Sequence, residues 1–329
     1  MKKRFKLVMP IIMACFALSS CDLFNGNGGS SKKSTKDYGE YYSGYDMTLK
    51  GGRLAIELQK LCFAKHKSWV TYGQVNTYFS RKTDENGNVT SNSAEAAADG
   101  SDQNEYFYSG LKQKGYGTRE HVWPCANSSG LWRHDESSVK DKFNIEYSNG
   151  KFYIGGGSDL FHVRTCESKM NSARGNSKFI DFDDEEFAGI RSQAVEFPRT
   201  GGGWKLKLQG LDSNDQYAQK AEPDDNMKGD VARIVAYLWV HYTERGATPE
   251  KSLKVGDFEY TYQDFTGQLS LTNIMGYNDV KKCQEVLKEW NKLDTPSSVE
   301  RLRNDTVQKI QGNRNPFVDH PDLMDQLFQ

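Results

Sequence analysis

Four features are missing from this sequence of 329 residues, and each absence argues against a class of protein. Basic residues are not in excess, because 43 lysines and arginines face 44 aspartates and glutamates, so the overall charge does not indicate a nucleic-acid-binding protein. No Cys-x-x-Cys spacing occurs, which argues against a zinc site. No apolar run reaches the roughly 20 residues that a membrane-spanning helix needs, and no internal repeat is visible.

The first 20 residues are typical of an export signal, with a basic start and an apolar run over Leu7–Leu18. Leu18-Ser19-Ser20-Cys21 resembles a bacterial lipoprotein cleavage box, so we expect Cys21 to be lipidated and the protein to be held at the extracytoplasmic side of a membrane. The alternative is an ordinary signal peptide with an incidental cysteine. Removal of residues 1–20 takes away four positive charges and no negative one. Contacts with phosphate would then require a local basic patch or a bound cation.

The segment that follows is predicted to be a tether. Residues 21–46 contain mostly Gly, Ser, Asn, Lys and Tyr without apolar periodicity. Residues 47–329 are predicted to form one folded domain, since 36% of the chain is apolar and 12% aromatic, enough for a sizeable core.

Four cysteines remain in this domain, namely Cys62, Cys125, Cys166 and Cys283. An even number in an oxidising compartment permits two disulfides in three possible connectivities. Buried free thiols are the alternative.

Helices are predicted in the first and last thirds of the domain, over Arg53–Phe63, Tyr72–Phe79, Lys228–Glu244, Val280–Leu293 and Val299–Gln311. Ser297 and Glu300 form a capping box before the last of these, and Gly312 ends it.

The middle third favours short strands, such as Lys151–Ile154, a surface loop over Thr83–Asn104 and a short helix over Glu167–Arg174. This order favours an α+β fold, mostly helical and in a single domain.

The segment Arg119-Glu120-His121-Val122-Trp123-Pro124 places an acid beside a histidine. Hydrolysis of a phosphodiester needs a base that activates water and oxygen ligands for a hard cation. His121 suits the first role because an imidazole titrates near neutrality, and Glu120 suits the second because magnesium prefers oxygen ligands. The structural alternative pairs Glu120 with Arg119 and buries His121 as a core residue.

Asn171 lies in the predicted short helix, fifty residues after His121. Its amide oxygen could complete the coordination of the cation. Because the amide is neutral, the cation keeps more positive charge for the developing phosphorane.

At these residues the sequence resembles the bacterial endonuclease I family, whose catalytic unit is a histidine–metal ββα core. Further matching segments, in the same order, are Asp159-Leu160, Asn171-x-x-Arg174-Gly175-Asn176, Glu222-Pro223, Lys228–Arg233, Arg303-Asn304-Asp305 and Gln311–Pro321. The resemblance extends from about Leu49 to the last residue.

The resemblance implies that His121 is the general base and that Glu120 and Asn171 hold Mg²⁺, with Mn²⁺ or Ca²⁺ as alternatives. The expected activity is hydrolysis of DNA, and also of RNA, by a monomer with little sequence preference, leaving 5′-phosphates. A rival hypothesis is a catalytically inactive lipoprotein that binds nucleic acid.

The family also has an arginine between the base and the asparagine that stabilises the cleaved phosphate. Arg133 and Arg164 are the candidates, and Arg174 is a third, although Arg174 equally suits a salt bridge within the short helix. His162 is expected either to contact substrate or to be structural.

Other polar residues are given structural roles. Asn313–Pro321 suits turns and packing, Asp230 and Arg233 suit an internal ion pair, and Glu222 is expected at the surface. Cys166 with His162 nearby is a weaker candidate for a nucleophile, because no third residue orients the pair.

Overall fold

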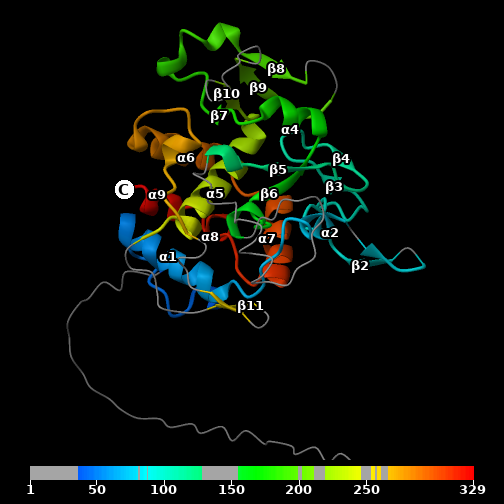
Figure 1. The fold of residues 1–329 in the computed structure, drawn as a ribbon. Coiled ribbons are helices and arrows are strands. Elements are labelled where there is room, and N and C mark those ends of the chain that lie inside the picture. Colours follow the sequence, from blue (N-terminus) through cyan, green and yellow to red (C-terminus); the bar gives the residue numbers. More distant parts are fainter. Residues whose placement is uncertain are drawn as a thin grey trace, which may run out of the picture. The chain divides into compact units, whose positions relative to one another are not determined.

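The longest helix, α5 (Asp225–Tyr242), packs against α1 (Gly51–Lys65) and α6 (Val280–Leu293) (Figure 1). This computed structural model describes residues 36–80, 82–86, 88–127, 155–198, 202–210, 219–245, 253–255, 258–260 and 266–329. Contacts divide the chain into residues 1–37 and 38–329, and the description below concerns the second unit. Within the described part, no helix has both the length and the apolar character needed to cross a bilayer.

Helix α5 is buried on almost every side, as expected for a helix inside a core. It starts three residues before the predicted Lys228, because the side chain of Asp224 accepts a hydrogen bond from the Asn226 amide and caps the helix.

The other helices largely match their predictions. Helix α6 has the predicted bounds, whereas α1 is two residues longer at each end and α2 (Val75–Phe79) is shorter than predicted. The Ser297 half of the capping box of α7 (Ser298–Gln311) is confirmed, since the Glu300 amide donates to Ser297 Oγ over 3.1 Å. The Glu300 carboxylate instead accepts from Arg233 Nη2 over 2.6 Å. Gly312 ends α7 in the left-handed region at φ 93°. Two short helices follow, α8 (Pro316–Asp319) and α9 (Leu323–Leu327).

Four short strands form a mixed sheet in the order β7-β10-β9-β8, which lies at the top of Figure 1. Strand β10 (Lys220–Glu222) is parallel to β7 (Lys178–Phe179) and antiparallel to β9 (Leu206–Gln209), and β9 is antiparallel to β8 (Val195–Phe197). The combination of helices and sheet agrees with the predicted α+β class. The strand predicted over Lys151–Ile154 lies outside the described residues.

The remaining strands form antiparallel pairs. These are β1 (Lys82–Thr83) with β2 (Val89–Ser91), β3 (Asn104–Glu105) with β4 (Lys112–Gln113), β5 (Thr118–His121) with β6 (Val163–Cys166), and β11 (Leu253–Val255) with β12 (Phe258–Tyr260).

The prediction of a surface loop over Thr83–Asn104 is wrong for its middle part. Residues 93–97 are buried, and the Glu95 carboxylate accepts hydrogen bonds from Arg164 Nε and the Thr165 amide. Arg303 Nη1 lies 2.5 Å from the same carboxylate. The polar composition of this segment suggested that it is exposed to solvent, but Glu95 belongs to a buried network of charged side chains.

The tether also ends earlier than predicted. A 3₁₀ turn forms over Glu40–Tyr42, and the buried Tyr42 hydroxyl donates to Asp319 Oδ2 over 2.6 Å. The Tyr38 ring stacks edge-on against His320 at 4.9 Å. The folded part therefore begins at residue 38. The sequence did not predict this boundary, because the aromatic residues that pack here are isolated and form no periodic pattern. Residues 1–20 and Cys21 lie outside the described residues.

The segment Asn313–Pro321 packs inside the fold, as predicted. The Asn315 side chain caps α8 by accepting from the Phe317 amide over 3.0 Å and also donates to the Arg233 carbonyl. The expected ion pair between Asp230 and Arg233 is present at 3.5 Å.

Glu222, by contrast, was expected at the surface, and that prediction is wrong. Its carboxylate is buried and lies 2.7 Å from Lys228 Nζ and 3.2 Å from Lys207 Nζ. The ammonium groups of these two lysines compensate the negative charge of the buried carboxylate.

Candidate active site

Strands β5 and β6 with helix α4 (Ser168–Arg174) bring together the residues that the sequence singled out. The antiparallel register places Glu120 opposite Arg164 and His121 opposite Val163. Helix α4 begins two residues after β6, and Asn171 Nδ2 donates to Thr118 Oγ1 and to the Arg119 carbonyl, both over 3.0 Å. These bonds attach the amide nitrogen to β5, so the amide oxygen is the atom that can bind a ligand.

Glu120 is a buried acid, with only 2% of its surface exposed. The Tyr108 hydroxyl donates to Oε1 over 2.9 Å, and Arg174 Nη1 lies 3.5 Å from the same oxygen. Burial raises the pKa of Glu120 to about 7, although Arg174 and the Tyr108 hydrogen bond act in the opposite direction. A divalent cation would compete with a proton for this carboxylate at neutral pH.

His121 is oriented by a backbone carbonyl. Its Nε2 lies 2.8 Å from the Gly157 oxygen, and its ring stacks on Tyr72 at 5.3 Å. Since a carbonyl oxygen only accepts, Nε2 carries the proton and the lone pair is on Nδ1. Burial is the main cause that lowers the pKa of His121 to about 4, so the ring is neutral at neutral pH.

These side chains line one cleft of about 470 Å³. The lining residues are Tyr72, Arg119, Glu120, His121, Pro124, Cys125, Ala126, Asn171, Ser172, Gly175 and Asn176. A carboxylate and an amide oxygen are hard donors, and a cleft leaves room for water molecules on a cation. The donors therefore fit Mg²⁺ held by Glu120 and Asn171.

Arg119 has a different partner from the one that the structural alternative gave it. Its guanidinium does not pair with Glu120 but lies 3.7 Å from the centre of the Tyr72 ring, and Nη1 donates to the Tyr72 carbonyl over 2.7 Å. Arg119 lines the cleft beside His121. Residues two apart in a strand share a face, so this neighbourhood was visible in the sequence. The contact between Arg119 and Tyr72 could not be predicted from the sequence.

Arg164 is buried away from the cleft, which contradicts its expected contact with substrate. Its guanidinium lies 3.2 Å from Glu95 and 3.8 Å from Asp230. The buried carboxylates raise the pKa of Arg164, and its side chain stabilises the interior.

Arg174 is fully buried too, so the alternative of a structural role applies. It donates to the carbonyls of His121 and Val122 over 3.2 and 2.5 Å, beside its contact with Glu120. Arg174 thus holds the end of β5 in place. The remaining candidate, Arg133, lies outside the described residues.

His162 is structural as well. Nδ1 lies 2.6 Å from the Gly156 oxygen, and Nε2 accepts from the Trp123 amide over 3.0 Å. Both nitrogens thus bind backbone groups, and the fully buried ring offers no surface to substrate.

Among the described cysteines, Cys62, Cys166 and Cys283 are free thiols, in agreement with the second of the two alternatives. Cys62, Cys166 and Cys283 are buried, and Cys125 lines the cleft. Burial raises the pKa of Cys166 well above its ordinary value, which contradicts a nucleophilic role.

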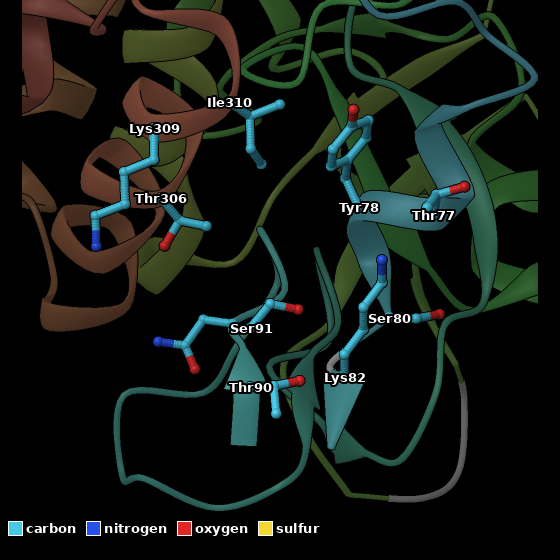
Figure 2. A pocket seen from close by; sticks show the side chains of 10 residues that line it. Thr77, Tyr78, Ser80, Lys82, Thr90, Ser91, Thr306, Lys309 and Ile310 are labelled. Atoms are coloured by element: carbon cyan, nitrogen blue, oxygen red, sulfur yellow. The ribbon is translucent and has the colours of Figure 1, made fainter. Parts of the chain in front are cut away.

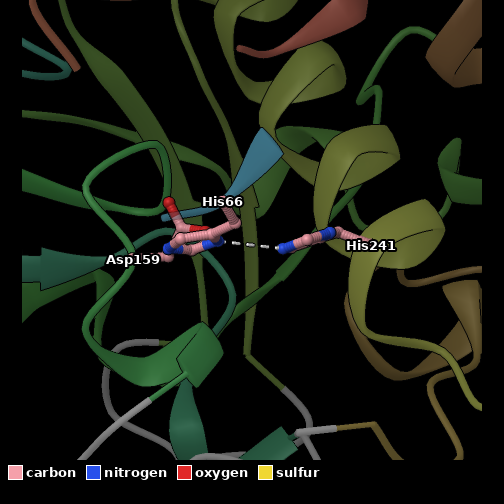
Figure 3. Close-up of side chains that lie close together, drawn as sticks. All are labelled: His66, Asp159 and His241. Atoms are coloured by element: carbon pink, nitrogen blue, oxygen red, sulfur yellow. Dashed lines mark hydrogen bonds between the residues drawn. The ribbon is translucent and has the colours of Figure 1, made fainter. Parts of the chain in front are cut away.

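A second cluster of possible ligands, His66, Asp159 and His241, lies in the core (Figure 3). His66 Nδ1 and His241 Nε2 are 3.3 Å apart, and His66 Nε2 lies 3.1 Å from the Ser68 oxygen. Because Nε2 of His66 donates a hydrogen bond to that carbonyl, Nδ1 of His66 accepts a hydrogen bond from Nε2 of His241. Burial lowers the pKa of both rings, so the pair is a hydrogen bond between neutral imidazoles.

Asp159 in this cluster is already saturated with hydrogen bonds. Its Oδ2 accepts from the hydroxyls of Tyr237 and Tyr242 over 2.7 and 2.6 Å. Its Oδ1 accepts from the Phe161 amide over 2.8 Å and from Gln311 Nε2 over 3.2 Å. Four donors fill the lone pairs of a carboxylate. We therefore assign the cluster to the folding core and not to a metal.

The comparison with known families decides the relationship. The sequence model of the endonuclease I family matches residues 53–322, which include β5, β6 and α4. The chain belongs to the endonuclease I family. Strand β5 and Asn171 are thus part of the region that this endonuclease I chain shares with its relatives.

Two curated relatives of this endonuclease I family member are named extracellular ribonucleases. The protein from Bacillus subtilis (strain 168) is 33% identical over 211 residues, which cover 64% of this chain and 53% of the relative. The protein from Bacillus amyloliquefaciens is 33% identical over 204 residues, which cover 61% and 55%. The chain thus matches about half the length of these relatives.

Proposed function

We propose that this endonuclease I family member is a metal-dependent nuclease that hydrolyses phosphodiester bonds in RNA and DNA with little sequence preference. One observation supports this most strongly: a neutral histidine, a carboxylate and an amide oxygen lie on one cleft. The names of the two relatives support RNA as a substrate. We further infer that β5, β6 and α4 are the ββα-metal core of the family.

The chemistry follows from the orientation of three side chains. Glu120 and Asn171 would hold Mg²⁺, which supplies positive charge to the phosphate and the leaving oxygen. His121 Nδ1 takes a proton from the attacking water, and the Gly157 carbonyl keeps the ring in the required tautomer. Attack on phosphorus with departure of the 3′-oxygen leaves a 5′-phosphate.

Arg119 is the residue that we assign to the substrate phosphate. It lies on the cleft, and the Tyr72 ring and carbonyl hold its guanidinium in place. An arginine fits two phosphate oxygens at once, and stacking on an aromatic ring leaves its outer N–H groups available. Among the described arginines considered for this role, Arg164 and Arg174 are buried, which favours Arg119.

The proposed location is outside the cytoplasm, with a lipid on Cys21. The support is the lipoprotein-like Leu18–Cys21 segment and the word extracellular in the names of the relatives. At this location, the proposed role of the enzyme is to digest nucleic acid outside the cell.

The decisive experiment removes the base. Plasmid DNA and single-stranded RNA are incubated with the protein, with Mg²⁺ and with EDTA. We expect cleavage only with Mg²⁺, and His121→Ala should reduce its rate by about 10²–10⁴. His320→Ala is the control, because His320 contacts Tyr38 and Tyr42 and does not line the cleft. If the intact protein binds nucleic acid but does not cut it with Mg²⁺, Mn²⁺ or Ca²⁺, the rival hypothesis of an inactive binding protein replaces this one.

A further inference from the structure

A second groove of about 470 Å³ lies between helix α7 and the α2–β1–β2 segment (Figure 2). Its lining residues are Thr77, Tyr78, Ser80, Lys82, Thr90, Ser91, Asn92, Thr306, Lys309 and Ile310. None of them lines the catalytic cleft. The groove is thus a separate site on the same domain.

The groove is cationic. Lys82 and Lys309 are exposed and lie on its two sides, on β1 and α7 (Figure 2). Among its described lining residues none has a carboxylate, although the whole chain has 44 acids for 43 basic residues. A local patch of this kind is what an acidic protein needs to bind a polyanion.

The other lining side chains suit a polynucleotide in particular. Hydroxyl and amide groups on α2, β2 and the residues that follow can bind phosphate oxygens and sugars. The half-buried ring of Tyr78 lines the groove and offers a surface on which a base can stack. Stacking requires unpaired bases, so the features favour a single strand.

Helix α2 connects the groove with the catalytic cleft. Tyr72 lines the cleft, and the turn after it continues into α2 because the Val75 amide donates to the Thr71 carbonyl. Ser80, just beyond the other end of α2, lines the groove. Eight residues of chain span at most roughly 29 Å, so one strand of about nine nucleotides at ~3.4 Å each can reach from one site to the other.

We propose that this groove is an auxiliary binding site for single-stranded nucleic acid, in which Lys82 and Lys309 contact the backbone of a substrate whose scissile bond lies in the catalytic cleft. The proposal rests on the nuclease function proposed above. If the groove binds substrate in this way, the affinity for long substrates depends on Lys82 and Lys309, which are remote from the proposed metal ligands. The rate of the chemical step does not depend on these two lysines.

The test compares a long and a short substrate. Cleavage of an unstructured 30-nucleotide RNA and of a trinucleotide is measured for the full protein and for the double variant Lys82→Gln/Lys309→Gln. We expect KM for the long RNA to rise roughly tenfold with kcat unchanged, and the trinucleotide kinetics to stay the same. The matched control is Lys50→Gln/Lys281→Gln, which removes two exposed lysines that line neither the groove nor the cleft.

Salt dependence gives a second readout. Binding of the same RNA is measured in the His121→Ala background, which prevents cutting. Loss of two backbone contacts should lower the slope of log affinity against log salt concentration by about 1.4 for a single strand. The proposal is overturned if the groove variant behaves like the control variant, or if it loses activity equally on the trinucleotide. Failure of the intact protein to cut either substrate would instead refute the nuclease function itself.

Discussion

At the scale of single residues, the proposed metal ligand Glu120 accepts a hydrogen bond from a strained neighbour. Tyr108 has φ 68°, and it is the one non-glycine residue in the left-handed region among those described. Such a conformation costs on the order of 1–2 kcal/mol for a side chain of this size. Its hydroxyl is the donor to Glu120. The strained residue thus makes the contact that orients the Glu120 carboxylate.

Another single residue, His66, makes stability depend on pH. Its side chain is 1% exposed, and burial lowers its pKa from 6.5 to about 4. Between these values the unfolded chain binds the proton and the folded chain does not, so the free energy of unfolding falls as the pH decreases. We expect a contribution on the order of 3 kcal/mol to be lost across this window.

The measurement for His66 is urea unfolding across this pH range for the native protein and for His66→Gln. The variant should show a shallower decrease in stability with acid. An identical slope for both proteins would show that His66 is not responsible.

The candidate site residues could be predicted from sequence because the motifs that carry the family resemblance single them out. Glu120, His121 and Asn171 meet in one cleft as phosphodiester hydrolysis requires. The roles of the arginines could not be predicted, since Arg164 and Arg174 look like any phosphate-binding arginine until their burial is known.

At the scale of elements, the contact between α5 and the end of α6 requires a glycine. A Cβ on Gly229 would overlap with the Asp294 carbonyl and approach Arg233 Nη1 to 2.7 Å. Gly229→Ala should therefore lower the free energy of unfolding by about 1–3 kcal/mol. Gly52→Ala is the matched control, because Gly52 in α1 has open space around it. The control should be neutral or should stabilise by about 0.5–1 kcal/mol.

Chemical denaturation of both glycine variants would measure the difference. If Gly229→Ala and Gly52→Ala had the same free energy of unfolding, α5 and the end of α6 could move apart without loss of stability.

Elements with local signals were predicted better than elements without them. The capping box at Ser297 and the glycine at 312 define α7 within one residue. Strands β1 and β2 were missed, because strands of two or three residues are defined only by a partner whose position the sequence does not show. The buried Glu95 was missed because its partners come from distant parts of the chain.

At the scale of the whole molecule, Arg303 on α7 connects the last third of the chain with strand β6 and the segments around it. Its guanidinium donates to the carbonyls of Ala94, Leu160 and Val163 and pairs with Glu95. Arg303→Met leaves buried acceptors without a donor, which should cost about 3–5 kcal/mol.

The control for this variant is Arg301→Met, since Arg301 is exposed on the same helix. Thermal unfolding of both variants should show a large loss for Arg303 only. A small effect at Arg303 would mean that water or Arg164 compensates the Glu95 charge.

The connection through Arg303 has a consequence for the synthesis of the protein. Strand β6 and the turn before it are held by Arg303 and by Gln311, whose Oε1 accepts from the Leu160 amide. These residues leave the ribosome long after His121. We therefore expect a growing chain to complete the proposed active site only after Arg303 and Gln311 have been synthesised.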